Sequence, residues 1–301
     1  MTMRCTRPFF RVPVAQDDFE NFKIFQNQDS AKAHCNAFNL DWSRVQMIPC
    51  GKCLSCRKQQ AFEWSMRFSA DYDMLGKKGS FLTLTYDDDH LPVDEQGRGI
   101  LKKEDLQRFF KRCRSRGLSF RYLSCGEYGS KGMRPHYHCL FAGEDFSEDS
   151  KPVPGSKSRQ SDLLDELWPF GHTYLGDIST ESINYVSGYV LKRAIGDQTW
   201  LQGRPPEFRL MSSRPALGRL ALERDSVSID RSGRWSTPAG TSTPPRYYFN
   251  SVLDPAEKYL QQGINEQRRL ATAEKTRKAG LSFDEDNLQR DAALLRGYKP
   301  R

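Results

Sequence analysis

Hydrophobic and polar positions alternate most clearly in the middle of the chain, where they predict the strands of a sheet. Residues 81–86 read FLTLTY, residues 120–125 read FRYLSC and residues 134–141 read RPHYHCLF. Their aromatic and apolar content is typical of strands buried on at least one face. Residues 171–176, GHTYLG, resemble a further strand. The glycine-rich residues 126–132 predict a hairpin that joins the second strand to the third.

Between these strands, apolar residues recur at the spacing of an amphipathic helix. This spacing predicts helices over residues 58–75, 102–116 and 162–168. The second helix is basic on its outer side, and its core side consists of Leu106, Phe109, Phe110 and Cys113. A further helix follows an N-cap at Ser179 or Thr180 and reads ESINYVSGYVLKRAIG. These elements predict an α+β fold, with a central antiparallel sheet and helices on one face.

The remaining segments suggest how the chain is divided. Residues 1–47 have no clear period and are predicted to form an irregular N-terminal extension, and the domain that carries the sheet is predicted over 48–222. Residues 144–160 are polar and contain prolines, which predicts a surface loop. Residues 223–252 are predicted to be a linker with an aromatic segment, and residues 253–301 a charged helical tail. The sequence leaves the role of that tail open.

Composition adds a bias toward polyanions. The chain has 301 residues, a formal net charge of +8 and a pI near 9.0, which permits nucleic-acid binding. Its mean hydropathy is −0.72, and no apolar run approaches the length of a membrane span. The first residues, MTMRCTRPFF, lack the apolar core of a secretory signal. We therefore expect a soluble intracellular protein whose cysteines are reduced.

Two histidines on one predicted strand suggest a metal site. Side chains at positions i and i+2 of a strand leave the same face, so His136 and His138 point together. The hairpin before them brings Glu127 back toward these imidazoles. One carboxylate and two imidazoles suit Mg²⁺ or Mn²⁺ better than a closed structural zinc site. The alternative is that one histidine satisfies a backbone carbonyl, the other is solvated, and Glu127 is a solvated hairpin carboxylate.

A second group of candidate ligands is the CxxCxxC motif of Cys50, Cys53 and Cys56. Thiolates at this spacing can ligate a structural zinc, which normally takes four ligands. Three residues elsewhere can supply the fourth ligand: Cys35, His34 and Cys5. Iron–sulfur ligation fits the spacing less well. The alternative is that the three cysteines are buried thiols at the start of the next helix.

The last predicted helix carries Tyr185, Tyr189 and Lys192 at positions i, i+4 and i+7. At about 100° per residue, the three fall within roughly 60° of one another on one helix face. A tyrosine hydroxyl has a pKa near 10, so it attacks only with help from a base, a cation or a polarised electrophile. Lys192 can supply positive charge to the phenolate or the leaving group. The alternative is that both tyrosines are core residues and Lys192 extends to water.

Three of these segments together resemble a known family. The strand FLTLTY, the stretch GEYGSKGMRPHYHCLF and the helix YVSGYVLK occur in the order found in HUH endonucleases. In particular, the chain resembles the replication initiator proteins of gokushoviruses, which are small single-stranded-DNA phages of the Microviridae. The resemblance runs from about Cys50 to Arg219 and includes PCGKCLSC, LWPFG and FRLMSSRPALGR.

The resemblance implies a central antiparallel sheet of HUH endonuclease type with flanking helices, spanning residues 48–222. It implies that His136 and His138 are metal ligands in the middle of the sheet, and that Glu127 completes a site for Mg²⁺ or Mn²⁺. The tyrosine helix would pack beside this strand and leave a gap wide enough for one phosphate.

The same resemblance assigns roles on the tyrosine helix. Tyr185 and Tyr189 match the paired nucleophiles of phage initiators with two tyrosines, and Lys192 matches the lysine that follows them. The implied activity is initiation of rolling-circle replication, by nicking and rejoining single-stranded origin DNA through a 5′-phosphotyrosine intermediate. The implied partners are origin DNA and the host helicase and polymerase, in the cytoplasm of the bacterial host, with no membrane involved.

Two other interpretations remain open from the residues. The chain can be a plasmid initiator or transposase of the same superfamily, which differs in substrate rather than chemistry. It can also be a non-catalytic DNA-binding protein stapled by zinc, in which the CxxCxxC motif matters and the two histidines are structural.

Overall fold

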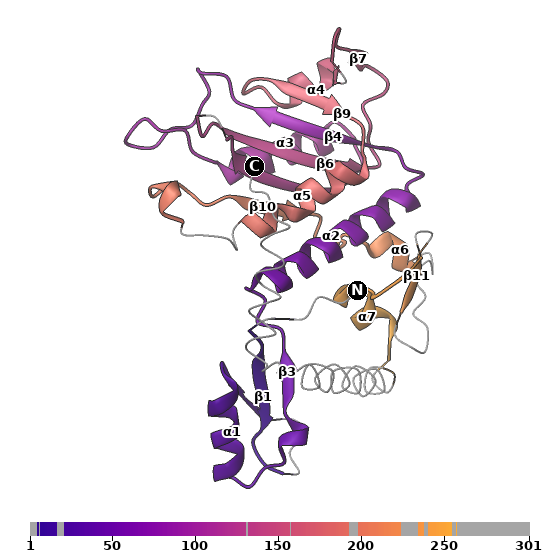
Figure 1. Cartoon of the computed structure of the whole chain (residues 1–301). Helices are drawn as coiled ribbons and strands as arrows, with labels where there is room; N and C mark the ends of the chain where they lie inside the picture. Colours follow the sequence, from indigo (N-terminus) through magenta and orange to yellow (C-terminus); the bar gives the residue numbers. More distant parts are fainter. Residues whose placement is uncertain are drawn as a thin grey trace. The chain divides into compact units, whose positions relative to one another are not determined.

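The computed structural model describes residues 5, 7–16, 21–130, 132–156, 158–192, 198–223, 234–237, 240–254 and 257 (Figure 1). The helical tail predicted over 253–301 lies almost wholly outside these residues. The chain divides into two compact units, the first reaching Gln60 and the second beginning at Ala61. The domain limits expected from the sequence stay predictions.

The second unit is built on a seven-stranded sheet in which every paired neighbour is antiparallel. In spatial order the strands are β10 (Phe208–Met211), β5 (Arg121–Tyr128), β6 (Pro135–Ala142), β4 (Gly79–Thr85), β9 (Thr173–Gly176), β8 (Arg159–Gln160) and β7 (Lys151–Pro152). The histidine strand β6 lies between β5 and β4, so its predicted place inside the sheet is confirmed. The short strands β7 and β8 lie in the segment predicted to be only a loop.

Four helices flank this sheet: α2 (Leu54–Met74), α3 (Lys103–Ser115), α4 (Asp162–Leu167) and α5 (Thr180–Lys192). Each was predicted within a few residues. The largest difference is that α2 begins four residues earlier than predicted, at Leu54, inside the cysteine motif. The mixture of helices and an antiparallel sheet confirms the α+β class.

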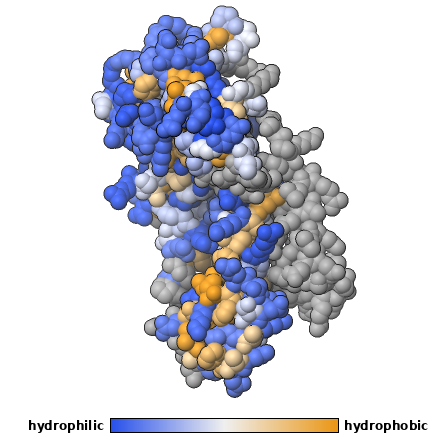
Figure 2. All heavy atoms as spheres, turned by 90° about the vertical axis from the view of Figure 1, so that its left-hand side faces the viewer, coloured by the Kyte–Doolittle hydropathy of each residue, from blue (hydrophilic) through white to orange (hydrophobic). Residues whose placement is uncertain are grey.

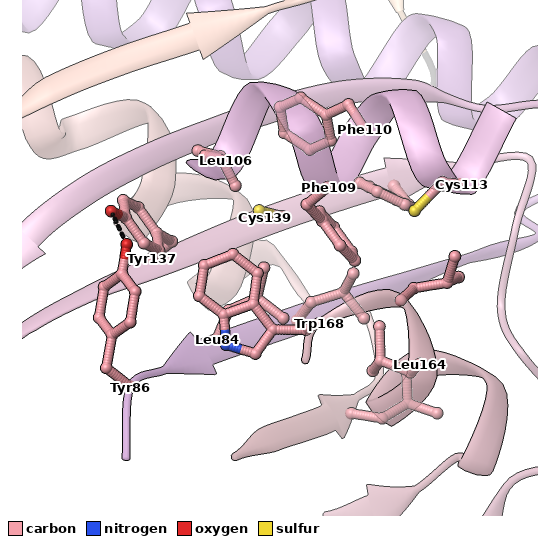
Figure 3. Close-up of a cluster of buried hydrophobic side chains, with 14 of the residues drawn as sticks. Leu84, Tyr86, Leu106, Phe109, Phe110, Cys113, Tyr137, Cys139, Leu164 and Trp168 are labelled. Atoms are coloured by element: carbon pink, nitrogen blue, oxygen red, sulfur yellow. Dashed lines mark hydrogen bonds between the residues drawn. The ribbon is translucent and has the colours of Figure 1, made fainter. Parts of the chain in front are cut away.

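One face of the sheet packs against α3 and α4 around an aromatic core (Figure 3). The predicted core side of α3 is confirmed, since Leu106, Phe109, Phe110 and Cys113 are all buried there. Tyr137, the residue between the two histidines, points into this core. Its hydroxyl lies 2.7 Å from that of Tyr86 and donates to the carbonyl of Lys102. The bulky residue of the motif is therefore accommodated on the face opposite the imidazoles.

The other face packs against α2 and α5, which corrects the prediction that helices cover one face only. Phe68 of α2 and Val186 of α5 are buried with Leu140 of β6 in a second core. Along β6 the two cores alternate, because successive side chains of a strand point to opposite faces. A strand buried on both faces reads as a continuous apolar run, so residues 139–142 gave no alternation from which a second helical layer could be predicted.

A buried carboxylate connects α2 to the segment that follows β10. Asp71 is fully buried and lies 3.3 Å from Nε of Arg121. It also accepts the backbone N–H groups of Gly218, at 2.7 Å, and Leu220, at 3.2 Å. These two amides stand at the start of α6 (Arg219–Glu223), so Asp71 satisfies donors that a helix leaves free at its N-terminus. Burial raises the pKa of Asp71, although these donors and Arg121 act in the opposite direction.

The region predicted to be a linker with an aromatic segment contains regular structure where it is described. Strands β11 (Trp235–Thr237) and β12 (Gly240–Ser242) pair, and α7 (Arg246–Val252) follows them. Tyr248 of α7 is fully buried and packs against the ring of Trp235. This confirms that the aromatic segment covers a core. The 3₁₀ helix η2 (Gln198–Leu201) precedes β10.

The first unit corrects the prediction of irregular structure for residues 1–47. It contains a three-stranded antiparallel sheet, a helix and a 3₁₀ helix: β2 (Phe22–Phe25), β1 (Phe9–Pro13), β3 (Gln46–Ile48), α1 (Gln28–Ala37) and η1 (Trp42–Arg44). These strands have three to five residues, which is too short for a period of two to be recognised.

None of the described helices is both long enough and apolar enough to cross a membrane. On the face shown in Figure 2, the described surface is mainly hydrophilic with smaller hydrophobic areas, as the low mean hydropathy leads one to expect.

Candidate metal and nucleophile site

The β5–β6 hairpin brings the predicted acid and histidines together. Glu127 pairs in register with His136, and His138 follows two residues later on the same face. The Nε2 atoms of both imidazoles lie 2.9 Å from one oxygen, Oε1 of Glu127. Glu127 is only 3% exposed, so its charge must be balanced inside the protein. One candidate ligand atom from each of the three residues lies within 4.8 Å of the other two.

The opposite nitrogen of each imidazole is held by a neighbouring group. Nδ1 of His136 lies 3.1 Å from the carbonyl oxygen of Arg134. Because a carbonyl oxygen only accepts, this Nδ1 carries the proton and a neutral His136 presents a lone pair at Nε2. Nδ1 of His138 lies 2.9 Å from Oγ1 of Thr83, its register partner on β4. Such contacts orient imidazoles for metal binding.

The donor set fits a divalent cation. In neutral His136, the Nε2 lone pair faces a carboxylate oxygen at 2.9 Å, and two lone pairs at that distance repel unless a proton or a cation lies between them. Nitrogen and oxygen ligands from three side chains, with room for further ligands, suit an exchangeable Mg²⁺ or Mn²⁺ site. We therefore take Glu127, His136 and His138 as residues that can hold such an ion.

Helix α5 brings Tyr185 to the same carboxylate. Ser179 acts as the N-cap, since its hydroxyl accepts the N–H of Ser182 at 3.2 Å. Tyr185 lies almost two turns further on, where its hydroxyl donates a short hydrogen bond to Oε1 of Glu127. Its ring stands edge-on to His138, with ring centroids 5.1 Å apart. The expected gap for a phosphate is thus closed in this structure by a direct hydrogen bond.

The other two predicted residues of the helix are placed less completely. Tyr189 and Lys192 belong to α5, one and two turns after Tyr185, but their side chains lie outside the described part of the structure. Their roles stay predictions.

Comparison with known proteins places this site in a family. The family model of the replication-associated protein ORF2 matches residues 79–194. Replication-associated protein ORF2 of Spiroplasma virus 4 is 31% identical over 217 residues, which cover 69% of this chain and 67% of that protein. The chain belongs to the family of phage replication-associated proteins.

Two further relatives agree with this assignment. Replication-associated protein VP4 of Bdellovibrio phage phiMH2K is 32% identical over 215 residues, 67% of this chain and 66% of that protein. Replication-associated protein ORF4 of Chlamydia phage 1 is 30% identical over 188 residues, 57% of this chain and 46% of that protein. No solved structure matches the chain.

The part of this replication-associated protein that the family model matches contains the whole candidate site. Residues 79–194 run from the first residue of β4 to just beyond α5. Two residues that contact His138 within it were missed in the sequence: Thr83, and Phe81, whose ring stacks on the imidazole at a centroid distance of 5.4 Å. The signal available was their place on the strand FLTLTY, but the register between β4 and β6 is needed to choose them.

The cysteine motif of this replication-associated protein lies outside the matched residues. Cys50, Cys53 and Cys56 gather with Cys5, so Cys5 occupies the fourth position. The contact with Cys53 and burial raise the pKa of Cys5 to about 12. The two other candidates lie elsewhere: Cys35 is buried in the core of the first unit, and His34 packs between Phe25 and Phe38.

Proposed function

We propose that this protein initiates rolling-circle replication as an HUH-type endonuclease, nicking and rejoining single-stranded origin DNA. The observation that supports this most directly is the convergence of a tyrosine hydroxyl, a buried carboxylate and two oriented imidazoles, in a member of a replication-associated family. A tyrosine that served only as core would not need its hydroxyl on the carboxylate between the two histidines.

Glu127, His136 and His138 would hold the catalytic ion. A bound Mg²⁺ or Mn²⁺ would polarise the scissile phosphate and offset the charge that develops on its oxygens. Thr83 and the carbonyl of Arg134 fix the two rings, so that Nε2 of each is available to the ion. Phe81 covers one side of the His138 ring and limits its rotation.

The bond that forms joins a tyrosine Oη to phosphorus, and the bond that breaks joins phosphorus to the 3′-oxygen of the preceding nucleotide. The products are a 5′-phosphotyrosine and a free 3′-OH, so the phenol proton is balanced by the proton on the leaving oxygen. In Tyr185 that proton already points at the Glu127 carboxylate. Entry of a phosphate must therefore break this hydrogen bond and turn the hydroxyl toward phosphorus.

Two tyrosines one helical turn apart would allow repeated cycles. While Tyr185 or Tyr189 carries the 5′ end of the displaced strand, the other would cut the regenerated origin. The reaction conserves the energy of the phosphodiester bond, so the same chemistry in reverse joins the ends. Lys192, a turn further along α5, would supply positive charge to the phenolate or leaving oxygen.

The sheet face that carries the site also carries a cationic residue that suits a DNA strand. Arg209 of β10 pairs in register with Cys125, which in turn pairs with His138. Paired residues point to the same face, and two strand spacings are about 10 Å. Arg209 stacks on Trp64 of α2, 4.7 Å from the ring centroid. We propose that the strand crosses this face in the cytoplasm of the host, where the 3′-OH primes the host polymerase and a host helicase follows.

The test uses fluorescent single-stranded oligonucleotides tiled across the genome that encodes the chain. With Mn²⁺, one or a few oligonucleotides should form an adduct that survives SDS, and peptide mass spectrometry should place the nucleotide on Tyr185 or Tyr189. The double variant Tyr185→Phe with Tyr189→Phe should form none. The variant His136→Ala with His138→Ala should lower adduct formation by at least about 10³-fold while the far-ultraviolet dichroism stays unchanged.

Tyr174→Phe is the matched control, because Tyr174 is half exposed on β9 and lies outside both tyrosine positions of α5. It should form adduct at the normal rate. An adduct that persists in the double tyrosine variant refutes the nucleophile assignment. Binding of oligonucleotides without any adduct under these conditions supports the non-catalytic alternative.

A further inference from the structure

The first unit contains a cluster of four cysteines that the nicking reaction does not use. Cys5 precedes β1, Cys50 and Cys53 precede α2, and Cys56 lies in the first turn of α2. The four Sγ atoms lie within 4.8 Å of one another. Two of the separations are 3.8 Å, between Cys5 and Cys53, and 4.0 Å, between Cys50 and Cys56.

These separations match those of a tetrahedral zinc site. A Zn–S bond is about 2.3 Å long, so two sulfurs on a regular tetrahedron lie about 3.8 Å apart. A disulfide requires about 2.05 Å, and all four cysteines are free thiols here. A cluster of several irons occupies the centre of its site and therefore needs sulfurs set further apart.

The backbone around the cluster donates to its sulfurs. The N–H groups of Lys52 and Cys53 point at Sγ of Cys50, at 3.4 and 3.3 Å. The N–H of Cys56 points at Sγ of Cys53 at 3.5 Å, and the N–H of Cys50 points at Sγ of Cys5 at 3.3 Å. Amide donors and the N-terminus of a helix as long as α2 both stabilise negative charge on sulfur.

The charges of the surrounding chain suit a thiolate site. Four thiolates with one Zn²⁺ carry a net charge of −2, and the motif itself contributes Lys52, Arg57 and Lys58. Arg57 is fixed across the turn, since its Nε donates to the carbonyl of Lys52 at 3.0 Å.

The first unit also lacks a core large enough to hold it together without such a site. Its buried apolar residues are Phe10, Val12, Ala31, Cys35 and Val45 in the part of the chain that the structure describes. Domains of this size commonly need a metal or disulfides, because the apolar area they bury barely offsets the loss of chain entropy.

We propose that Cys5, Cys50, Cys53 and Cys56 bind one Zn²⁺ in a closed tetrahedral site that fastens the chain before β1 to the start of α2. The site is structural, since all four positions of the tetrahedron are filled by protein and none is left for a substrate. It is independent of the proposed nicking site, which draws its ligands from β5 and β6.

The test begins with metal analysis of the full chain purified under reducing conditions, in the His136→Ala with His138→Ala background to remove the second metal site. We expect about one zinc per chain by mass spectrometry. Refolding with Co²⁺ should give the sulfur-to-metal charge-transfer bands of a tetrahedral thiolate site. Less than about 0.1 equivalents of metal, together with no cobalt spectrum, overturns the proposal, and so does iron in place of zinc.

Variants identify the ligands. Cys5→Ser should lose at least about 10-fold in zinc affinity, whereas Cys5→His should retain zinc, since imidazole also ligates it. Cys35→Ala is the matched control, a buried cysteine of the same unit outside the cluster, and should keep one zinc. To avoid dependence on a variant that does not fold, thiol modification of the unchanged protein should release its zinc in step with four cysteines. Unchanged zinc affinity in Cys5→Ser overturns the assignment of the fourth ligand.

Discussion

At the residue scale, each imidazole of the candidate site depends on one contact that sets its orientation. For His138 that contact is the hydroxyl of Thr83, 2.9 Å from Nδ1. A ring that loses such a partner rotates more freely and presents Nε2 to the ion less often, which typically lowers metal affinity 10- to 100-fold, as a rough range.

Thr83→Val tests this contact, because valine keeps the shape and strand preference of threonine but has no hydroxyl. We expect the Mn²⁺ concentration that gives half-maximal adduct formation to rise about 10-fold or more. Thr85→Val is the control. Its hydroxyl donates to the carbonyl of His172 instead, so its Mn²⁺ requirement should stay within about twofold of the unchanged protein. An equal shift in both variants means that the strand, not the contact with His138, is responsible.

At the scale of elements, the packing of α2 against the segment after β10 depends on Asp71. Replacing it with alanine leaves the guanidinium of Arg121, whose side chain is 11% exposed, without its anion. It also leaves the amides of Gly218 and Leu220 without an acceptor. We expect Asp71→Ala to lower the free energy of unfolding by about 3–5 kcal/mol, measured by urea denaturation.

Asp71→Asn separates charge from hydrogen bonding. Because burial raises the pKa of Asp71, its ionised form is already disfavoured, and a neutral amide of the same shape should cost less than alanine does. Asp73→Ala, two residues further along α2, removes an exposed carboxylate 4.0 Å from Lys77 and should cost less than about 1 kcal/mol. A loss below that value in Asp71→Ala would show that the buried pair does not stabilise the fold.

Elements with a strong local pattern were predictable, and those defined by pairing between distant residues were not. Strand β4 and helix α3 follow from the spacing of their own apolar residues. The first unit does not, because its short strands gain their stability from one another. Cys5 stands 45 positions before Cys50, and only the closing of that unit selects it over His34 and Cys35. Thr83 likewise becomes a contact of His138 only once the register of β4 and β6 is known.

At the scale of the whole molecule, the net charge of +8 predicts that DNA binding depends strongly on salt. Each phosphate that is neutralised contributes about −0.7 to the slope of log Kobs against log salt for a single strand. If the strand crosses the face of Arg209, Arg209→Ala should weaken binding and make that slope shallower by about 0.7. Fluorescence anisotropy at several NaCl concentrations measures it.

Arg108→Ala is the comparison, because Arg108 is an exposed residue of the basic helix α3, which covers the opposite face of the sheet. Its slope should match that of the unchanged protein. If the slope changes for Arg108 and not for Arg209, the DNA follows the basic side of α3 and the proposed path is wrong.

Strand β6 serves two faces at once, since His136 and His138 alternate with residues of the aromatic core such as Tyr137. Inserting or deleting a single residue within the strand would exchange the two sets, sending imidazoles into the apolar core and the phenol of Tyr137 to the reactive face. Descendants of this protein can therefore vary these positions by substitution, but changes in chain length must be confined to the turns at either end. The spacing of the motif is preserved by the geometry of the sheet itself, even apart from any demand of catalysis.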